Sequence, residues 1–233
     1  MPARAAIVAP SPLYDVHKPR RPSVTFATQS HAPDRTVRPV VIRISIVIPS
    51  YQQAQFIEQT IDSVLSQQYP NVELIVIDGG SSDGTVDILK RFDKYLTFWV
   101  SEKDKGQTHA INKGLARITG QVWSFLNSDD LLRPGSLHTV ACAFASQPDV
   151  HWLSGCTHVF GEGITPWTLA PGDPETPLHY LTPWDRPVQH VFPASVSCFM
   201  SRHVLDTIGA FDESLHYSMD IEYYAREIGR AHV

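Results

Sequence analysis

Hydrophobic and polar positions between residues 41 and 146 form blocks of two kinds. Short runs rich in β-branched residues, typical of buried strands, cover residues 41–49, 72–77, 97–101 and 121–126. Apolar residues that recur every three or four positions predict helices over residues 56–65, 86–92, 108–117 and 136–145. Strands that alternate steadily with helices indicate an α/β domain, with a mostly parallel sheet flanked by helices.

Polar side chains follow three of these predicted strands. The stretches PSYQQ, DGGSSDGT and NSDD come after the first, second and fourth strands. In parallel sheets, ligands bind beyond the carboxyl ends of the strands, where the loops converge. We therefore expect these side chains to meet in one crevice.

Asp129 and Asp130 lie side by side directly after the last of these strands. Adjacent carboxylates repel each other, and partial burial makes them costly unless something compensates their charge. A bound cation would do so. The alternative is a surface turn in which one aspartate caps a helix that Pro134 opens. The recurrence of acidic residues at successive strand ends favours the cation.

The second half of the chain has a weaker pattern. Residues 150–161 are compatible with a hairpin, and residues 166–187 form a proline-rich stretch that predicts a long irregular loop. Its aromatic side chains could stack on a sugar or anchor the loop to the core. His190 follows this stretch, and we expect it near an acceptor.

Composition and charge narrow the class of protein. With 233 residues and 42% hydrophobic content, the chain can bury one sizeable core. The net charge is −5, yet residues 1–41 are basic and rich in proline, which predicts a disordered leader. This pattern favours a solvated tail over a segment that contacts anionic lipid. The acidic remainder argues against nucleic acid as a partner.

Location and redox chemistry also follow from the sequence. No apolar run approaches the roughly 20 residues that span a bilayer, and the N-terminus has no apolar signal region, so we expect a cytoplasmic protein with peripheral membrane contact at most. The three cysteines form no C-x-x-C pair, which predicts buried, reduced thiols. The eleven histidines form no metal-binding motif.

Five motifs together make the chain recognisable. They are ISIVIPSYQQ, VIDGGSSDGT, DKGQTHAINKGL, FLNSDDLLRPGSL and GAFDESLHYSMDIEYYAR. In this order they resemble family-2 glycosyltransferases with the GT-A fold, especially bacterial enzymes that build surface polysaccharides or O-antigen-like glycans. The resemblance covers roughly residues 44–226. It implies a nucleotide-binding half over residues 42–149 and an acceptor-side half over residues 150–233, within one GT-A domain of residues 42–233.

The resemblance assigns the donor-binding residues. Asp78 matches the carboxylate that accepts a hydrogen bond from N3–H of the donor's pyrimidine, and an ionised carboxylate can only accept. Pro49 and Tyr51 match the segment that lines the base. Asp104 and Lys105 match a loop beside the nucleotide. The implied donor is a nucleoside diphosphate sugar, most simply a UDP-sugar.

The same comparison assigns the metal. Asn127, Ser128 and Asp129 occupy the positions of the family's D-x-D motif, so Asp129 would contact a divalent cation on the donor diphosphate. Asn127 brings no charge but could bond to ribose or to a metal-bound water, and Asp130 could support the site from behind. Mg²⁺ and Mn²⁺ both favour such oxygen ligands.

Transfer to a hydroxyl also needs a base. Asp220 matches the family's catalytic carboxylate, with an N-cap as its alternative role and Glu222 as a substitute base. One base without a nucleophile implies direct displacement with inversion, onto a glycan or lipid-linked acceptor. The last predicted helix is short, so we expect a domain that is truncated at its C-terminus.

Two other functions stay open. A sugar nucleotidyltransferase would share the layout, but usually has a glycine-rich, basic loop after its first strand. A sugar-nucleotide-binding pseudoenzyme is favoured only by Asn127. A dehydrogenase is disfavoured because no G-x-G-x-x-G follows a strand.

Overall fold

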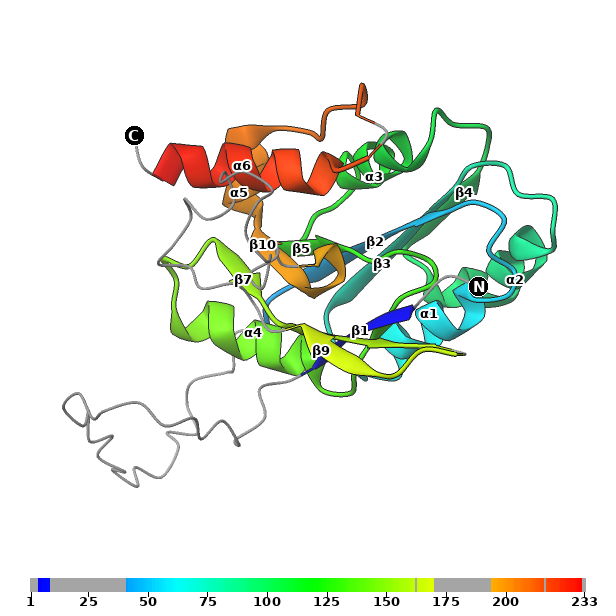
Figure 1. Cartoon of the computed structure of the whole chain (residues 1–233), viewed down its shortest axis with the longest axis horizontal. Helices are drawn as coiled ribbons and strands as arrows, with labels where there is room; N and C mark the ends of the chain where they lie inside the picture. The colour runs from blue at the N-terminus through cyan, green and yellow to red at the C-terminus, as the bar shows by residue number, and fades with distance from the viewer. Residues whose placement is uncertain (1–3, 9–40, 162, 170–193, 216, 232–233) are drawn as a thin grey trace.

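The computed structural model describes residues 4–8, 41–161, 163–169, 194–215 and 217–231. Its centre is a six-stranded sheet with the order β4-β3-β2-β5-β10-β7 (Figure 1). Four neighbouring strands are parallel: β4 (Phe98–Ser101), β3 (Val72–Asp78), β2 (Ile44–Ser50) and β5 (Val122–Phe125). Two antiparallel strands complete it: β10 (Cys198–Ser201) and β7 (Trp152–Ser154). The expected mostly parallel sheet is confirmed.

Helices cover both faces of this sheet (Figure 1). The face below it in the view carries α1 (Ile57–Leu65), α2 (Thr85–Phe92) and α4 (Ser136–Ser146). The face above it carries α3 (Gln107–Leu115), α5 (Arg202–Ile208) and α6 (Met219–Ala231). Short 3₁₀ turns follow α2 (Asp93–Tyr95) and precede β10 (Ser195–Ser197).

The strands explain why the core has two halves. Alternate side chains of β2 point to opposite faces: Ile44, Ile46 and Ile48 join one buried cluster, whereas Val47 joins the other. All seven residues of β2 are buried. This central strand therefore reads as a nearly continuous apolar run, as strands covered on both faces do.

A second, four-stranded sheet has the order β6-β1-β8-β9. It consists of β6 (Leu131–Leu132), β1 (Arg4–Val8), β8 (Cys156–Phe160) and β9 (Trp167–Leu169). β1 runs parallel to β6 and antiparallel to β8. The expectation of a leader without structure is thus wrong for residues 4–8, whose backbone fills the position between two other strands. The other leader residues, 1–3 and 9–40, lie outside the described residues.

Two smaller expectations are also wrong, and the alternative role of the paired aspartates as helix caps is excluded. β7 and β8 do not form a hairpin, because Gly155 alone separates them and they belong to different sheets. α4 begins at Ser136 with Gly135 before it, so neither Asp129 nor Asp130 caps it and Pro134 does not open it. All three cysteines are free, but only Cys198 is buried and Cys142 is exposed.

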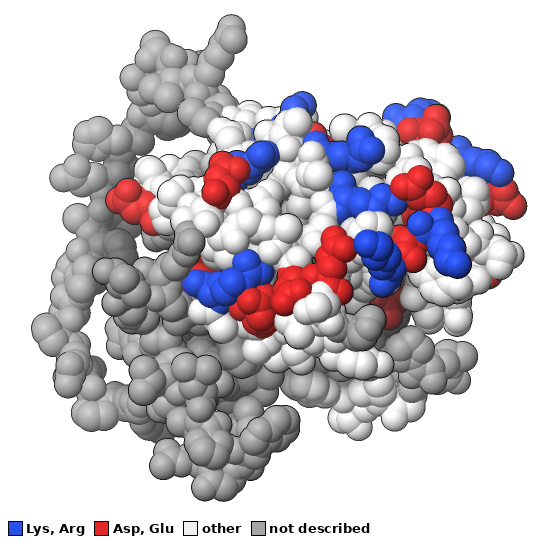
Figure 2. Space-filling model, turned by 90° about the horizontal axis from the view of Figure 1, so that it is seen from above, with Lys and Arg blue, Asp and Glu red and all other residues white. Residues whose placement is uncertain are grey.

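Residues 170–193, including most of the predicted loop and His190, lie outside the described residues. Basic and acidic side chains are interspersed over the described surface that faces the viewer in Figure 2. Among the helices that the structure describes, none has both the length and the apolar character needed to cross a membrane.

Candidate functional site

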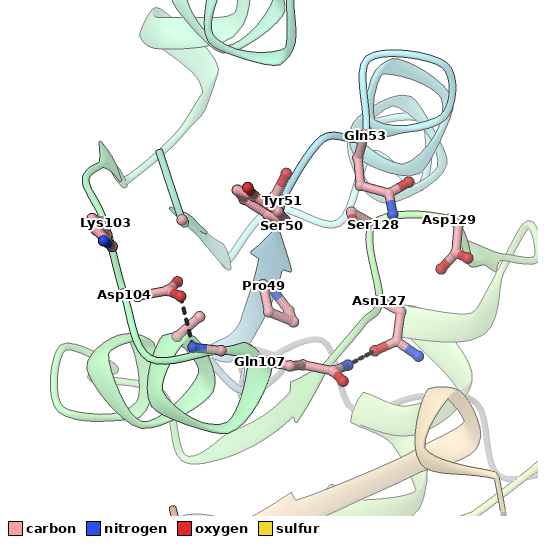
Figure 3. Close-up of a pocket in the computed structure, with 13 residues that line it drawn as sticks. Pro49, Ser50, Tyr51, Gln53, Lys103, Asp104, Gln107, Asn127, Ser128 and Asp129 are labelled. Carbon is pink, nitrogen blue, oxygen red and sulfur yellow. Dashed lines mark hydrogen bonds between the residues drawn. The ribbon is translucent and has the colours of Figure 1, made fainter. Parts of the chain in front are cut away.

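A cleft of about 640 Å³ opens at the carboxyl ends of β2, β3 and β5, beside the first turn of α3. β2 has β3 on one side and β5 on the other, which places the cleft where the order of the strands reverses and where such sheets bind ligands. Figure 3 shows the side chains around it. Its lining residues are Pro49, Ser50, Tyr51, Gln53, Gly79, Lys103, Asp104, Gly106, Gln107, Ala110, Asn127, Ser128 and Asp129.

The segment after β2 supplies an aromatic side chain at the mouth of the cleft. Tyr51 is 61% exposed, which is unusual for a large ring in an ordered turn. The next residue, Gln52, has a φ of 54°, and its backbone N–H donates to Ser81 Oγ over 2.7 Å. Its side chain also bonds with Ser82. These bonds fix the turn that presents Tyr51, and leave the ring free for a ligand.

Asp78 lies behind the wall of the cleft. Its side chain is fully buried and is not among the lining residues. The carboxylate accepts hydrogen bonds from the backbone N–H groups of Gly80 and Ser81, at 3.1 and 2.9 Å. It also accepts from the hydroxyls of Ser81 and Ser101, each at 2.6 Å. In this structure Asp78 organises the turn after β3, and its neighbour Gly79 forms the wall.

The loop between β4 and α3 provides charge on this side of the cleft. Lys103 and Asp104 line it, and Asp104 Oδ1 accepts a hydrogen bond of 2.8 Å from the backbone N–H of Gly106. Lys105, the predicted basic residue, is exposed and lies outside the lining; its backbone N–H donates to His109 Nδ1 over 3.3 Å. The lysine at the cleft is therefore two positions earlier than expected.

The segment after β5 forms the opposite wall. The amide of Asn127 is engaged at both ends: Oδ1 accepts from Gln107 Nε2 over 2.7 Å, and Nδ2 donates to Asp130 Oδ2 over 3.0 Å. Asp130 is buried and does not line the cleft. Asn127 thus joins α3 to Asp130, and its amide oxygen already has a donor.

Asp129 differs from its neighbours. It lines the cleft beside Asn127 in Figure 3, and its carboxylate has no hydrogen-bond or ion-pair partner within the described ranges. The turn that carries it is fixed by the Thr60 hydroxyl, which donates to the carbonyl oxygen of Ser128 over 2.9 Å. A rigid backbone with an open carboxylate is suited to hold a cation.

The residues that line the cleft suit a metal ion that binds together with a phosphate ligand. They suit less well a metal ion that protein side chains alone coordinate. Among the described residues, no three His, Cys, Asp or Glu side chains are grouped for metal binding. Mg²⁺ is often bound by one or two carboxylates together with substrate phosphates and water. Asp129 can supply the one carboxylate that this arrangement needs.

Asp220 lies outside the cleft lining, as the second residue of α6. Its Oδ1 accepts from the backbone N–H of Ile221 over 2.9 Å, so it lies within the first turn and does not precede the helix as an N-cap does. Ser218, just before α6, has a φ of 60°, which is strained for a residue with a side chain. The substitute base Glu222 is paired with Arg226, at 2.6 Å.

Helix α3 links Asp220 to the cleft. Its first turn lines the cleft through Gln107 and Ala110. Its outer side holds the segment before α6: the Thr108 hydroxyl donates to the carbonyl of Leu215 over 3.2 Å, and Asn112 bonds with both backbone groups of Phe211. The base candidate and the cleft are thus attached to the same helix.

The charge of Asp220 acts on a buried group beside it. Burial, together with the negative charge of Asp220, raises the pKa of the Cys198 thiol to about 11. Burial first, then the neighbouring Cys198 and the charge of Asp220, raise the pKa of the Tyr224 hydroxyl well above its ordinary value. Neither group is therefore a source of protons or a nucleophile near neutral pH.

Among the lining residues that were not predicted from the sequence are Lys103 and Gln107, whereas Gln53 and Gly79 belong to the stretches PSYQQ and DGGSSDGT that were expected in the crevice. Gln107 had a signal, because it opens α3 within a motif that sequence analysis singled out. Lys103 had none, since neighbouring lysines at positions 103 and 105 differ only in where their side chains point.

Residues 45–209 match the family model described as Glycosyl transferase family 2, which is well over half of the chain. The chain belongs to this family. A relative named "Putative teichuronic acid biosynthesis glycosyltransferase TuaG", from Bacillus subtilis, is 40% identical over 90 residues, which are 37% of this chain and 36% of TuaG.

Solved structures share the GT-A fold of this family-2 chain. TarS 1–349 of S. aureus superposes with a TM-score of 0.60 at 19% identity, over 79% of this chain and 55% of that one. A mannosyltransferase of Pyrobaculum calidifontis, crystallised with GDP-Man and Mn²⁺, has a TM-score of 0.55 at 25% identity, over 80% and 51% of the two chains. The family-2 chain thus spans about a third of TuaG and about half of these two chains.

Proposed function

We propose that the chain is an inverting glycosyltransferase that moves a sugar from a nucleoside diphosphate sugar, UDP-linked, to a hydroxyl of a glycan or lipid-linked acceptor. The observation that carries the proposal is the open carboxylate of Asp129 in a cleft at the ends of β2, β3 and β5. Family membership supports the reaction class. TarS has been crystallised with UDP-GlcNAc, which supports the UDP donor.

The walls of the cleft suggest how the donor lies. The exposed ring of Tyr51 offers a surface on which the base can stack. Asp129, across the cleft, is suited to the diphosphate end, where a divalent cation would supply charge neutralisation to the leaving nucleoside diphosphate. The mannosyltransferase with bound Mn²⁺ supports such an ion here.

Asp220 is the proposed base. A carboxylate can take the proton of the acceptor hydroxyl as that oxygen attacks the anomeric carbon. Glu222 is less suited to this role, because its carboxylate is paired with Arg226. Asn112 and Thr108 position Asp220 indirectly through the segment that leads to α6. TuaG, which is named for teichuronic acid biosynthesis, supports a glycan or its lipid-linked precursor as the acceptor.

The donor site is tested by calorimetric titration of UDP with and without Mn²⁺. We expect the wild-type chain to bind UDP more tightly with the metal, and Asp129→Asn to lose this gain, weakening binding by about tenfold or more because a charge-assisted contact is lost. Asp87→Asn is the matched control, since Asp87 lies exposed on α2 and its carboxylate pairs, among the described residues, only with Lys90, over 3.0 Å. No binding of UDP to the folded wild-type chain would refute the proposal.

A sugar-nucleotide-binding pseudoenzyme is the second candidate, because the amide of Asn127 stands where the family motif has a carboxylate. A test of UDP-sugar hydrolysis, in which water is the acceptor, distinguishes a transferase from a pseudoenzyme. A transferase shows metal-dependent release of UDP that Asp220→Asn slows by about 10²-fold or more without changing UDP affinity. A pseudoenzyme binds UDP and releases none.

A further inference from the structure

The carboxyl group of Asp104 lies directly against Gly79 in the wall of the cleft. A Cβ atom built on Gly79 would be 3.0 Å from Asp104 Oδ2 and 3.2 Å from both Oδ1 and Cγ. Because Gly79 has no side chain, the Asp104 carboxyl group can occupy this position against the wall. A methyl group at position 79 would force this carboxylate to shift by a few tenths of an ångström.

One oxygen of Asp104 is fixed and the other is open. Oδ1 accepts from the backbone N–H of Gly106 over 2.8 Å, which sets the direction of the group toward the cleft in Figure 3. Within the part of the chain that the structure describes, Oδ2 accepts no hydrogen bond. A carboxylate held in this way presents one acceptor to a ligand at little further entropic cost.

Asp78 cannot offer the same contact in this structure. Four donors already surround its carboxylate, three on Oδ2 and one on Oδ1, and its side chain is fully buried behind the wall. Among the residues that line the cleft on the side of β3 and β4, Asp104 is therefore the one that carries a carboxylate.

We propose that Asp104 selects the base of the donor nucleotide by accepting a hydrogen bond from a ring N–H that is flanked by a carbonyl. Uracil N3–H and guanine N1–H have this pattern. At the corresponding positions cytosine and adenine carry a lone pair, which an acceptor-only carboxylate repels. The inference rests on the proposed donor cleft, and it transfers to Asp104 the base contact that the family resemblance gives to Asp78.

The test compares four nucleotides, UDP, GDP, CDP and ADP, each titrated with Mn²⁺ into the full chain. The wild-type chain should bind UDP or GDP more tightly than CDP and ADP, and the stronger of the two identifies the base. Asp104→Asn should reduce the preference for UDP over CDP, or for GDP over ADP, by about tenfold to a hundredfold, because an amide can also donate to a ring lone pair.

Two further variants make the result specific. Gly79→Ala should reduce the same preference, since its new methyl group displaces the Asp104 carboxylate. Asp87→Asn, the same chemical change on exposed α2, should leave it unaltered.

Three outcomes overturn the inference. The first is a wild-type chain that binds all four nucleotides equally. The second is an Asp104→Asn chain that keeps the full preference, with Asp78→Asn, verified as folded by its thermal transition, losing it instead. The third is a folded wild-type chain that binds none of the four, which removes the proposed function as well; the first two leave that function standing.

Discussion

At the scale of single residues, Glu73 shows how a charge can be buried without a cation in direct contact. It lies near the start of β3, at the end of the sheet away from the cleft, and is only 4% exposed. Its carboxylate accepts from the Ser45 hydroxyl and from both the backbone N–H and the hydroxyl of Thr119, the latter two at 2.7 and 2.9 Å. Burial alone would raise the pKa of Glu73, but these hydrogen bonds lower it below its ordinary value of 4.5.

This lowered pKa predicts acid sensitivity. The ionised group stabilises the fold above pH 4.5, and the contribution is lost as the pH falls through the lower pKa of the native state. Glu73→Gln should be destabilised by about 1–3 kcal/mol at pH 7, because its amide N–H₂ faces other donors. It should also lose less stability on acidification than the wild-type chain. Urea unfolding between pH 3 and 7 measures both, and parallel pH profiles would contradict the assignment.

The residues of the cleft show which site positions can be predicted from the sequence and which cannot. Pro49, Tyr51 and Asp129 stand at strand ends, and the topology alone was enough to bring them to one edge of the sheet. Asp78 stands there too, yet its side chain turns inward to the donors of its own turn. That choice depends on rotamers and on Ser101, a partner 23 positions away, which no local pattern reports. The roles of these residues stay predictions.

At the scale of elements, the contact between α3 and β2 is unusually close. A Cβ atom on Gly114 of α3 would lie 2.3 Å from Val47 Cγ1 of β2. Both residues are buried in the same half of the core, so the helix rests on the strand through a glycine. This contact sets the distance between α3 and the sheet, and the first turn of α3 lines the cleft.

Gly114→Ala should therefore destabilise the protein by about 1–3 kcal/mol through overpacking, although alanine is the better helix former. The double variant with Val47→Ala is the control, because it removes the methyl groups that clash. It should be more stable than the sum of the two single changes predicts, as measured by urea unfolding. A single variant as stable as the wild type would show that α3 shifts freely.

The same scale explains which elements the sequence predicted. Four strands and four helices between residues 44 and 146 were found because each is a continuous run with its own period. β7 and β8 were misjudged as a hairpin because β7 pairs with the distant β10, and β8 pairs with the distant β1 on one edge and with β9 on the other. Short strands carry little information about distant partners, so pattern alone cannot assign their pairing.

At the scale of the whole molecule, β1 connects the start of the chain to the segment that follows the cleft. Ala6 and Ile7 pair with Leu131 and Leu132, which come directly after Asp129 and Asp130. The other edge of β1 pairs with β8 along five residues. Without β1, both β6 and β8 would lose the strand between them.

Removal of residues 1–8 should consequently raise amide hydrogen exchange at residues 131–132 and 156–160, while β2 and β3 keep their protection. A chain that lacks only residues 1–3 is the control, because it retains the whole strand. Exchange followed by mass spectrometry measures the difference. Equal protection in the two truncated chains would show that β1 contributes nothing to the second sheet.

The strand order of the central sheet has a consequence for folding during synthesis on the ribosome. β2, β3, β4 and β5 are all complete once residue 125 has left the ribosome, whereas β10, the partner of β5 on its other edge, begins only at Cys198. At typical synthesis rates this interval lasts on the order of ten seconds. Throughout it, β5 is a bare sheet edge, so the nascent chain is exposed to pairing with another strand until β10 has been translated.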